Sequence, residues 1–340
     1  MITSFEIKSE EQLSIFCAMP EAPKLNMQDM PQKPDACWMA AQESGEASAR
    51  CSLWWTRTPH LEGHRVGLIG HYAATSGDAA RSLLKSAAEQ LASQGCTIAV
   101  GPIDGSTWQR YRLITERNGV PPFFLEPDNP EQWTTHFIES GFSSLATYSS
   151  AINDDLNRRD SRADTARKRL ESTGVKIREL RIDDFASELC RIYRVAEVSF
   201  RTNFLYSPIS ESAFSSQYER IRHFIRPELC LIAECDNRPV GFIFALPDAL
   251  QAARGEAIDT IIIKTVAVLP DRAYAGLGAF LVDRCQEISR SLGYRKAIHA
   301  LMHDANNSRN ISSRYARVIR RYTLFARELE NRSLRLRDSA

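Results

Sequence analysis

The sequence predicts a mixed α/β fold of two tandem domains, each a mixed twisted sheet flanked by helices. A strand, a helix and a second strand follow one another twice along the chain. This order usually forms a right-handed unit with its two strands side by side. Both helices end at a glycine, Gly95 and Gly293, where the left-handed residue that closes a helix is expected. A length of 340 residues suits two domains of ordinary size.

In the first half, the strand, helix and strand of this unit cover 64–74, 77–95 and 96–103. In the second half they cover 257–269, 275–293 and 294–302. The strand AIDTIIIKTVAVL at 257–269 is rich in β-branched residues, which pack well on a pleated surface. Because the same order of elements occurs twice, we expect an internal duplication.

Further elements precede the unit of the second half. Residues 175–200 predict a strand and an amphipathic helix, and 229–248 predict a hairpin that turns at 236–239. The helix carries side chains spaced for one buried face: Phe185, Leu189, Ile192 and Tyr193.

Each half ends in a closing segment, 129–150 in the first and 304–330 in the second. The first of these predicts a helix and a strand. The second predicts a short helix and a final alternating strand with four residues facing one side: Val318, Arg320, Tyr322 and Leu324.

These elements place a first domain at 1–152 and a second at 175–340. The segment between them, 153–174, is dense in charges of both signs and has few large apolar residues. We expect it to form a solvated connecting helix.

The composition excludes several classes of protein. Lys and Arg number 43 against 42 Asp and Glu, so the net charge of +1 argues against a nucleic-acid partner bound through a strongly basic surface. No stretch approaches the ~20 apolar residues that cross a bilayer, so we expect no membrane association. The first residues, MITSFEIKSEEQL, include acidic residues where a signal peptide is basic and then apolar. A soluble, cytoplasmic protein is therefore expected.

Eight cysteines are scattered singly, and none forms a CxxC pair. This spacing signals neither a zinc site nor a thioredoxin-type centre. We expect no metal, and we interpret the cysteines as small core or surface residues of a reducing compartment.

The most informative segment is TVAVLPDRAYAGLGAFLV, at 265–282. A strand ends at Pro270, and Gly276 and Gly278 open the helix that follows. The first-turn amides of a helix have no intrahelical acceptor, and the positive end of the helix dipole lies behind them, so they favour a phosphate. Arg272 is placed to add a charge-assisted contact. Neither GxxxxGK[ST] nor GxGxxG fits, since Leu281 stands three residues after Gly278.

This segment resembles the coenzyme A signature of the GCN5-related N-acetyltransferases, the GNAT superfamily. That signature is Gln or Arg, two variable residues, Gly, one variable residue, then Gly or Ala. Here the arginine lies four residues before the first glycine, one more than usual.

The resemblance implies acetyl-CoA, or another acyl-CoA, as co-substrate. The strand backbone at Val266, Ala267 and Val268 would bind the pantetheine arm and face the thioester oxygen. The pyrophosphate would lie on the loop and first helical turn, that is on Arg272, Ala273, Tyr274, Ala275, Gly276, Leu277, Gly278 and Ala279. Asn306 and Asn310 would make polar contacts to the pantetheine or acetyl group.

The first half lacks this glycine pair. When Gly95 is aligned with Gly293, Asp78 and Ala80 stand where Gly276 and Gly278 stand. A carboxylate at a helix N-terminus competes with phosphate for the same amides. We therefore expect a degenerate, structural first copy that walls off the acceptor pocket of the second.

By family analogy, the general base is a carboxylate on the strand at 257–269, where Asp259 is the candidate. A solvated aspartate at a strand end is the alternative interpretation. Lys264 on the same strand faces either the cleft or the solvent. Tyr315 is the candidate acid, with Tyr322 as an alternative. His299 and His303 are proton carriers or structural residues.

The acceptor pocket is expected along 197–218. Its aromatic residues fit an apolar or amine-binding wall, or the core: Phe200, Phe204, Tyr206, Phe214 and Tyr218. Glu197 is the carboxylate there suited to hold a cation.

The sequence thus predicts an acyl-CoA-dependent N-acyltransferase, in the first place an acetyltransferase, that transfers directly to a small-molecule or peptide amine. The chain would act as a monomer or homodimer. A non-catalytic acyl-CoA-binding or regulatory module is the main alternative. An aminoacyl transferase that uses charged RNA is a further one, disfavoured by the neutral charge.

Overall fold

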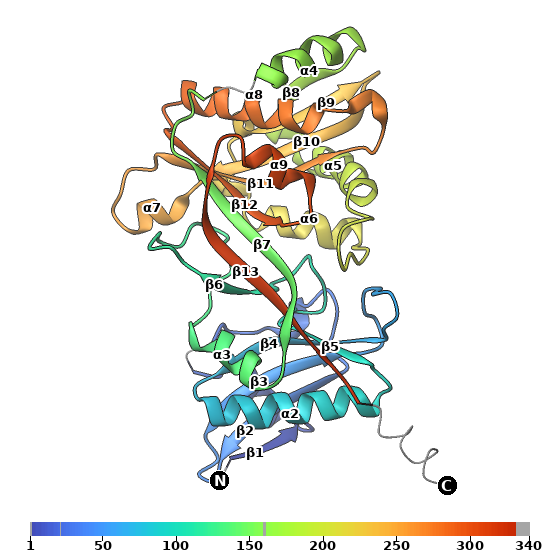
Figure 1. Cartoon of the computed structure of the whole chain (residues 1–340), viewed down its shortest axis with the longest axis vertical. Helices are drawn as coiled ribbons and strands as arrows, with labels where there is room; N and C mark the ends of the chain where they lie inside the picture. The colour runs from blue at the N-terminus through green and yellow to red at the C-terminus, as the bar shows by residue number, and fades with distance from the viewer. Residues whose placement is uncertain (1, 21, 159–160, 331–340) are drawn as a thin grey trace.

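The computed structural model describes residues 2–20, 22–158 and 161–330. Within them, the strands join into one mixed sheet that runs through the whole molecule (Figure 1). Its strand order is β1-β2-β3-β4-β5-β13-β7-β12-β11-β10-β9-β8, with the short β6 paired to β13. Helices cover both faces, so the expected mixed α/β fold is confirmed.

The first half contributes the elements β1 (Ile2–Glu6), α1 (Glu10–Cys17), η1 (Met27–Asp29), β2 (Ala36–Gln42), β3 (Ala47–Trp54), β4 (Val66–Ala74), α2 (Gly77–Ser93), β5 (Ile98–Gly101), β6 (Leu113–Glu116), α3 (Gln132–Glu139) and β7 (Ser143–Asn153). The connecting helix is α4 (Ser161–Ser172).

The second half contributes β8 (Lys176–Glu179), η2 (Ile182–Asp184), α5 (Phe185–Ser199), α6 (Glu211–Glu219), η3 (Arg222–Phe224), η4 (Pro227–Leu229), β9 (Cys230–Cys235), β10 (Arg238–Pro247), α7 (Ala249–Ala253), β11 (Thr260–Val268), η5 (Arg272–Tyr274), α8 (Leu277–Ser291), β12 (Lys296–His303), α9 (Asn307–Ser312) and β13 (Arg317–Glu328). The expected end of this half, 331–340, lies outside the described residues.

Both strand–helix–strand units form as the sequence predicts. In each, the two strands run parallel, β4 with β5 and β11 with β12. The crossover helices α2 and α8 bury one apolar stripe each, through Leu83, Leu84 and Leu91 in α2 and through Leu281 and Cys285 in α8. Spacings of four, seven and eight residues place side chains on one helical face.

The surrounding elements also form. The hairpin β9–β10 turns at Asp236 and Asn237, whose positive φ angles of 50° and 61° suit these two residue types. Helix α5 buries Phe185, Leu189 and Ile192 as expected, while Tyr193 is half-buried.

The connecting helix α4 differs from its expectation. The side chain of Leu170 is fully buried and packs with Leu277 and Leu281 of α8. The helix is therefore docked on the second half rather than surrounded by solvent.

The two closing strands are exchanged between the halves. β7 ends the first half but pairs with β12, from Ala297↔Asn153 to His303↔Tyr148. β13 ends the second half but pairs with β5 of the first, for example Phe325↔Gly101. The two strands also pair with each other along most of their length, and in Figure 1 they cross the middle of the molecule side by side.

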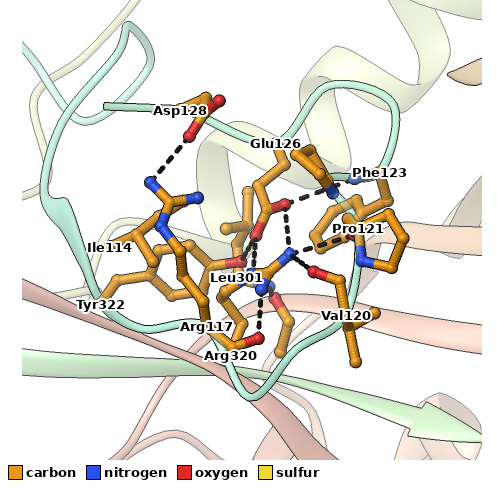
Figure 2. Close-up of polar contacts among 12 residues, drawn as sticks. Ile114, Arg117, Val120, Pro121, Phe123, Glu126, Asp128, Leu301, Arg320 and Tyr322 are labelled. Atoms are coloured by element: carbon orange, nitrogen blue, oxygen red, sulfur yellow. Dashed lines mark hydrogen bonds and ion pairs between the residues drawn. The ribbon is translucent and has the colours of Figure 1, made fainter. Parts of the chain in front are cut away.

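A buried ion pair fixes this junction. The guanidinium of Arg320, on β13, binds both oxygens of Glu126, with Nε–Oε1 at 2.8 Å and Nη2–Oε2 at 3.3 Å, and both side chains are fully buried. Arg320 also donates to the carbonyls of Arg117, Val120 and Pro121 (Figure 2). A strand of the second half thereby holds the loop 117–126 of the first.

Loss of Arg320 should weaken the junction severely. Arg320→Met leaves Glu126 buried without its counter-charge, which we expect to lower the free energy of unfolding by about 3–5 kcal/mol. Arg317→Met on the same strand is the control, because Arg317 is 63% exposed and pairs with Asp154 at the surface. Its effect should stay within about 1 kcal/mol. Urea denaturation measures both, and equal stability of the two variants would contradict this role of the pair.

Candidate functional site

The strands β11 and β12 separate part-way along their length. Their parallel pairing runs from Thr260↔Lys296 to Ile263↔His299, whereas β11 continues to Val268 and β12 to His303. On its other side β11 is bulged, because Phe244 pairs with Thr265 and Ala245 with Ile263, which leaves Lys264 out of the ladder. The edge of β11 beyond Ile263 is therefore free of β12. Such an edge binds an extended group through its backbone amides and carbonyls.

The predicted glycine loop lies at the end of this edge. After Val268 the chain makes the short turn Arg272–Tyr274, with the Asp271 carboxylate accepting from the Ala273 amide at 2.8 Å. Gly276 has φ +82° and occupies the N-cap position of α8, where it provides no side-chain acceptor for the first-turn amides. A left-handed conformation of this kind favours glycine. The amides at the start of α8 are thus left for another acceptor.

The other residues of the loop take different positions. Arg272, Ala273 and Ala275 are exposed and Tyr274 is half-buried, whereas Leu277 is buried in the core under α8, so its side chain is not a ligand contact. A Cβ at Gly278 would meet Ile311, Val266 and Val268 only at 3.7–3.8 Å. Ala279 follows it, half-buried, in the first turn of α8.

The connecting helix supplies a cation that the sequence interpretation missed. Arg169 of α4 donates a hydrogen bond to the carbonyl of Ala275, and the methyl group of Ala166 would lie 3.1 Å from a Cβ placed on Gly276. A guanidinium therefore stands beside the glycine loop. Its position within a run of mixed charge gave no signal, because such runs usually form solvated helix faces.

The β11 residues beside the loop alternate between the two faces of the sheet. Val266 and Val268 pack toward α8, while Ala267 is buried toward α5. The Val268 carbonyl accepts from the Ser199 hydroxyl at 2.9 Å, which ties the end of β11 to α5.

Helix α9 covers the separated strands on the α8 side. Asn306 is its N-cap residue and makes no capping bond through its side chain, while Asn310 is exposed on the helix. Ile311 packs with the core under α8, in line with its contact distance to Gly278. Both asparagines thus lie on the helix that the resemblance assigns to the pantetheine arm.

Tyr315 and His299 meet below α9. Tyr315 is 3% exposed, and its ring lies 6.3 Å from that of His299. His299 is the last residue of β12 paired with β11, and its Nε2 has no hydrogen-bond partner among the described residues. Burial lowers the pKa of His299 to about 4, so the imidazole is neutral at physiological pH.

Asp259 does not occupy the position expected of the base. It lies just before β11, at the end opposite the glycine loop. Its carboxylate accepts from Gln251 at 2.9 Å and Thr260 at 2.7 Å, and it pairs with Lys296 at 3.0 Å. Burial alone would raise its pKa, but these contacts outweigh it and lower the pKa to about 2. A carboxylate held this way stabilises the start of β11 and is too weak a base for proton transfer at neutral pH.

Tyr322 likewise lies away from the α8 face. Its hydroxyl contacts Ser150 at 3.0 Å and donates to Glu126, at the junction shown in Figure 2. Of the four residues expected to share one face of the final strand, Arg320 and Tyr322 do point the same way, since both bind Glu126.

The first half contributes side chains to the opposite, α5 face. Trp108 lies 5.9 Å from the rings of Phe200 and Phe214 and 6.2 Å from Tyr206, and its indole donates to the Ser207 carbonyl at 2.8 Å. Phe200, Tyr206 and Phe214 therefore form a cluster that Trp108 of the first half completes.

A cavity of about 510 Å³ opens where β12 ends. Phe204, His303 and Asp304 line it, together with the β7 segment 144–147. The rings of Phe204 and His303 lie 5.5 Å apart. The segment expected to bind the acceptor thus reaches the same edge of the sheet as the separated strands.

In the first half, the chain itself fills the equivalent opening. β4 and β5 pair only from Val66↔Ile98 to Leu68↔Val100. Beyond that point the Ile103 amide donates to the Ile69 carbonyl at 2.8 Å, and the His71 amide donates to Asp104 at 2.5 Å.

The helix start in the first half differs as well. The Ser76 side chain accepts from the Ala79 amide and so caps α2, and Asp78 in the first turn pairs with Arg81. The strand edge is therefore filled here, and the helix start is capped, in contrast to the second half.

The family model described as "Acetyltransferase (GNAT) family" matches residues 190–312, which contain β11, the glycine loop, α8 and β12. The segment 190–312 belongs to the GNAT family. The resemblance that the glycine motif indicated is therefore confirmed. The matched GNAT segment ends at α9 and leaves out the exchanged strand β13.

Comparison with individual proteins extends the similarity across both halves. A GCN5-related N-acetyltransferase from Anabaena variabilis aligns with a TM-score of 0.55 and 7% identity, over 97% of this chain and 73% of that one. At this identity the likeness establishes the GNAT fold alone.

Two curated relatives are more similar in sequence. Protein YghO of Escherichia coli is 25% identical over 63% of this chain and 56% of its own length. The bacterial ceramide synthase of Caulobacter vibrioides is 24% identical over 56% of this chain and 50% of its own length. The match thus spans about half the length of each relative.

Two further findings concern the described residues only. None of their helices combines the length and the apolar character needed to pass through a bilayer. No group of three or more His, Cys, Asp or Glu side chains among them is placed to hold a metal ion.

Replacing Asp259 should affect stability and leave ligand binding unchanged. Its pKa of about 2 lies below the usual value, so its contribution is present above about pH 4 and is lost as the pH falls through 2. We expect Asp259→Asn to lower the free energy of unfolding by about 1–2 kcal/mol at pH 7, with a gap that closes toward pH 2. The surface variant Glu256→Gln is the control. Weakened binding of acyl-CoA by the Asp259→Asn variant would contradict this interpretation and show that Asp259 takes part in the active site.

Gly70 should be needed for the filled opening of the first half. A Cβ there would collide with the Ile103 carbonyl and lie 2.8 Å from the Cα of Asp104. We expect Gly70→Ala to lower the free energy of unfolding by about 1–3 kcal/mol. Gly77→Ala, where the new Cβ would meet only Arg81 at 3.5 Å, should change it by less than about 0.5 kcal/mol. Thermal unfolding of both compares them, and equal melting temperatures would contradict the close packing.

Proposed function

We propose that the chain is an acyl-CoA-dependent N-acyltransferase that transfers the acyl group directly to an amine. One observation carries the proposal: an uncapped helix start at Gly276 adjoins the free edge of a strand that has separated from its parallel neighbour. The first feature suits a diphosphate, and the second suits an amide-containing arm. Both lie in the segment that the GNAT model matches.

The residues present fit coenzyme A. The amides of Gly276, Leu277, Gly278 and Ala279 would hold the pyrophosphate, with the guanidinium of Arg169 beside them and that of Arg272 exposed nearby. The backbone of 266–268 and Asn306 at the start of α9 would bind the pantetheine arm.

The acyl thioester supplies an activated carbonyl, and the chain supplies the groups around it. Backbone amides of the free β11 edge would stabilise the oxygen as it gains charge. The Tyr315 hydroxyl, buried beside the neutral His299, would give a proton to the leaving thiolate. The amine would approach from the α5 face, where Trp108 and the aromatic cluster lie.

We further propose a long-chain amine as acceptor and include long-chain acyl groups among the donors. One relative carries the name bacterial ceramide synthase, and a ceramide is an N-acylated long-chain amino alcohol. The aromatic lining of the α5 face and Phe204 at the 510 Å³ cavity fit an apolar acceptor. Acetyl transfer, a cytoplasmic location and a monomer or homodimer stay predictions from the sequence.

A non-catalytic acyl-CoA-binding module is the second candidate. The ion pair between Asp259 and Lys296 favours this module, because Asp259 is the carboxylate expected to act as the base. Thiol release from acetyl-CoA and hexadecanoyl-CoA, measured with amino acids, short amines, peptides and sphinganine, separates the two. Binding without thiol release on any amine would favour the module.

Binding of acyl-CoA should depend on the glycine loop. In Gly276→Glu/Gly278→Glu, two carboxylates would occupy the place of the diphosphate, and we expect affinity for acetyl-CoA and hexadecanoyl-CoA to fall at least about tenfold, or about 1.4 kcal/mol. Gly77→Glu places a carboxylate at the equivalent helix start of the first half and should bind like the wild type. Isothermal titration calorimetry measures all three. Absent binding by the wild type, or undiminished binding by the double variant, would overturn the proposal.

A further inference from the structure

Lys264 stands where the two strands part. It follows Ile263, the last β11 residue paired with β12, and it is the residue that the β10 ladder skips. Its ammonium donates to the Leu125 carbonyl at 3.3 Å, in the loop 117–126 of the first half. Because Ile263 and Val266 pack toward α8, this contact places Lys264 on the other face, from which the acceptor would approach.

The first half shapes the surroundings of this amine. Leu125 has φ +63°, which turns the loop beside β11, and the next residue is the buried Glu126. The loop is further fixed on the second half by the Phe124 amide, which donates to Asp248 at 2.8 Å, and by Arg254, which donates to the Pro122 carbonyl at 2.9 Å. These contacts hold the loop 117–126 in place beside Lys264.

The charged groups near Lys264 disfavour the protonated form of its amine. Arg112, just before β6, has its guanidinium 4.1 Å and 4.2 Å from the ring centroids of Tyr111 and Tyr148, and it donates to the Leu301 carbonyl of β12 at 3.4 Å. Glu126 is the nearby carboxylate, and its charge is already matched by Arg320 of β13.

Two phenols also lie near these groups. Tyr322 on β13 donates to Glu126, and Tyr218 on α6 hydrogen-bonds Thr265, the residue after Lys264. Burial raises the pKa of both phenols, so they add no charge near neutral pH. Burial first, and Arg112 second, lower the pKa of Lys264 to about 8, against an opposing effect of Glu126. A substantial fraction of Lys264 is thus neutral near pH 7–8.

Three other candidates for the proton acceptor are disfavoured by their contacts or by their pKa. Asp259 lies at the far end of β11 in an ion pair. Both oxygens of Glu126 are taken by Arg320, Tyr322 and the Phe123 amide. His299 lies on the α8 face, and its pKa of about 4 makes it a weak base.

We propose that Lys264 is the general base of the N-acyl transfer, held in place by the Leu125 carbonyl of the first half. This inference rests on the function proposed above. The neutral Nζ takes one proton from the acceptor ammonium, and the freed amine nitrogen bonds to the thioester carbonyl carbon. The C–S bond then breaks with its electron pair on sulfur, and the thiolate takes a proton from Tyr315 on the opposite face. The nitrogen loses its second proton to solvent as the amide forms, the Tyr315 phenolate regains a proton from solvent, and the lysine ammonium releases its proton to solvent.

The test uses the full chain with hexadecanoyl-CoA and, from the amine panel, the acceptor that gives the fastest thiol release. In the wild type, kcat at saturating acceptor should rise with pH through a pKa near 8, because the base must be neutral. Lys264→Met should lower kcat about 10²–10⁴-fold and abolish this pH dependence, with unchanged affinity for hexadecanoyl-CoA. Lys264→Arg should lose as much, since arginine keeps its proton.

The control is Lys176→Met, an exposed lysine on β8, which should keep the wild-type kcat and pH profile. A Lys264→Met protein with kcat within threefold of the wild type and the same profile would overturn the inference and leave the proposed function standing. A wild type that binds no acyl-CoA and releases no thiol would instead remove the proposed function itself.

A second measurement covers the case in which the variants fail to fold. Wild-type protein is labelled with trace acetic anhydride between pH 6 and pH 11, and the modification of Lys264 is compared with that of Lys176 by peptide mass spectrometry. Half-maximal reactivity of Lys264 near pH 8 supports the inference. A Lys264 that reacts with the same pH dependence as the exposed Lys176 would overturn it.

Discussion

The pairing of β7 with β13 is the contact on which the rest of the molecule depends. Each strand closes the sheet of the half to which it does not belong in sequence, so the two halves share one hydrogen-bonded sheet. The Arg320–Glu126 pair then fastens a first-half loop to this centre. Since that loop contacts Lys264, the strand exchange also sets the geometry of the face where we propose that the acceptor binds.

The two halves complete the same fold in different ways. In both halves a pair of parallel strands separates after three or four paired residues. In the first, the segment after β5 enters the gap, where the Ile103 amide donates to the Ile69 carbonyl, and the Ser76 side chain caps the helix. In the second, a glycine replaces the cap and the strand edge is left free. Small local differences in sequence thus separate a filled opening from an open strand edge.

Local patterns were enough to predict the two strand–helix–strand units, the hairpin and the glycine loop, because each is set by residues near in sequence. The strand exchange was not predictable, since the alternation of 317–328 fits any neighbouring strand. Asp259 was misplaced as the base because its partners Gln251 and Lys296 come from other elements. The side chain of Lys264 points as it does because of a β-bulge, which the sequence does not indicate. Arg169 reaches the glycine loop because α4 packs on the second half, and the charged sequence of this helix does not predict such packing.

The position of β13 also bears on how the protein is made. β5 cannot fill its outer edge until residues 317–328, near the end of the chain, have left the ribosome. Until then the nascent first half would expose unsatisfied backbone groups, a template for unwanted association. Contacts so distant in sequence form late and slowly. A chain that stops before residue 317 would therefore keep this edge of β5 unpaired.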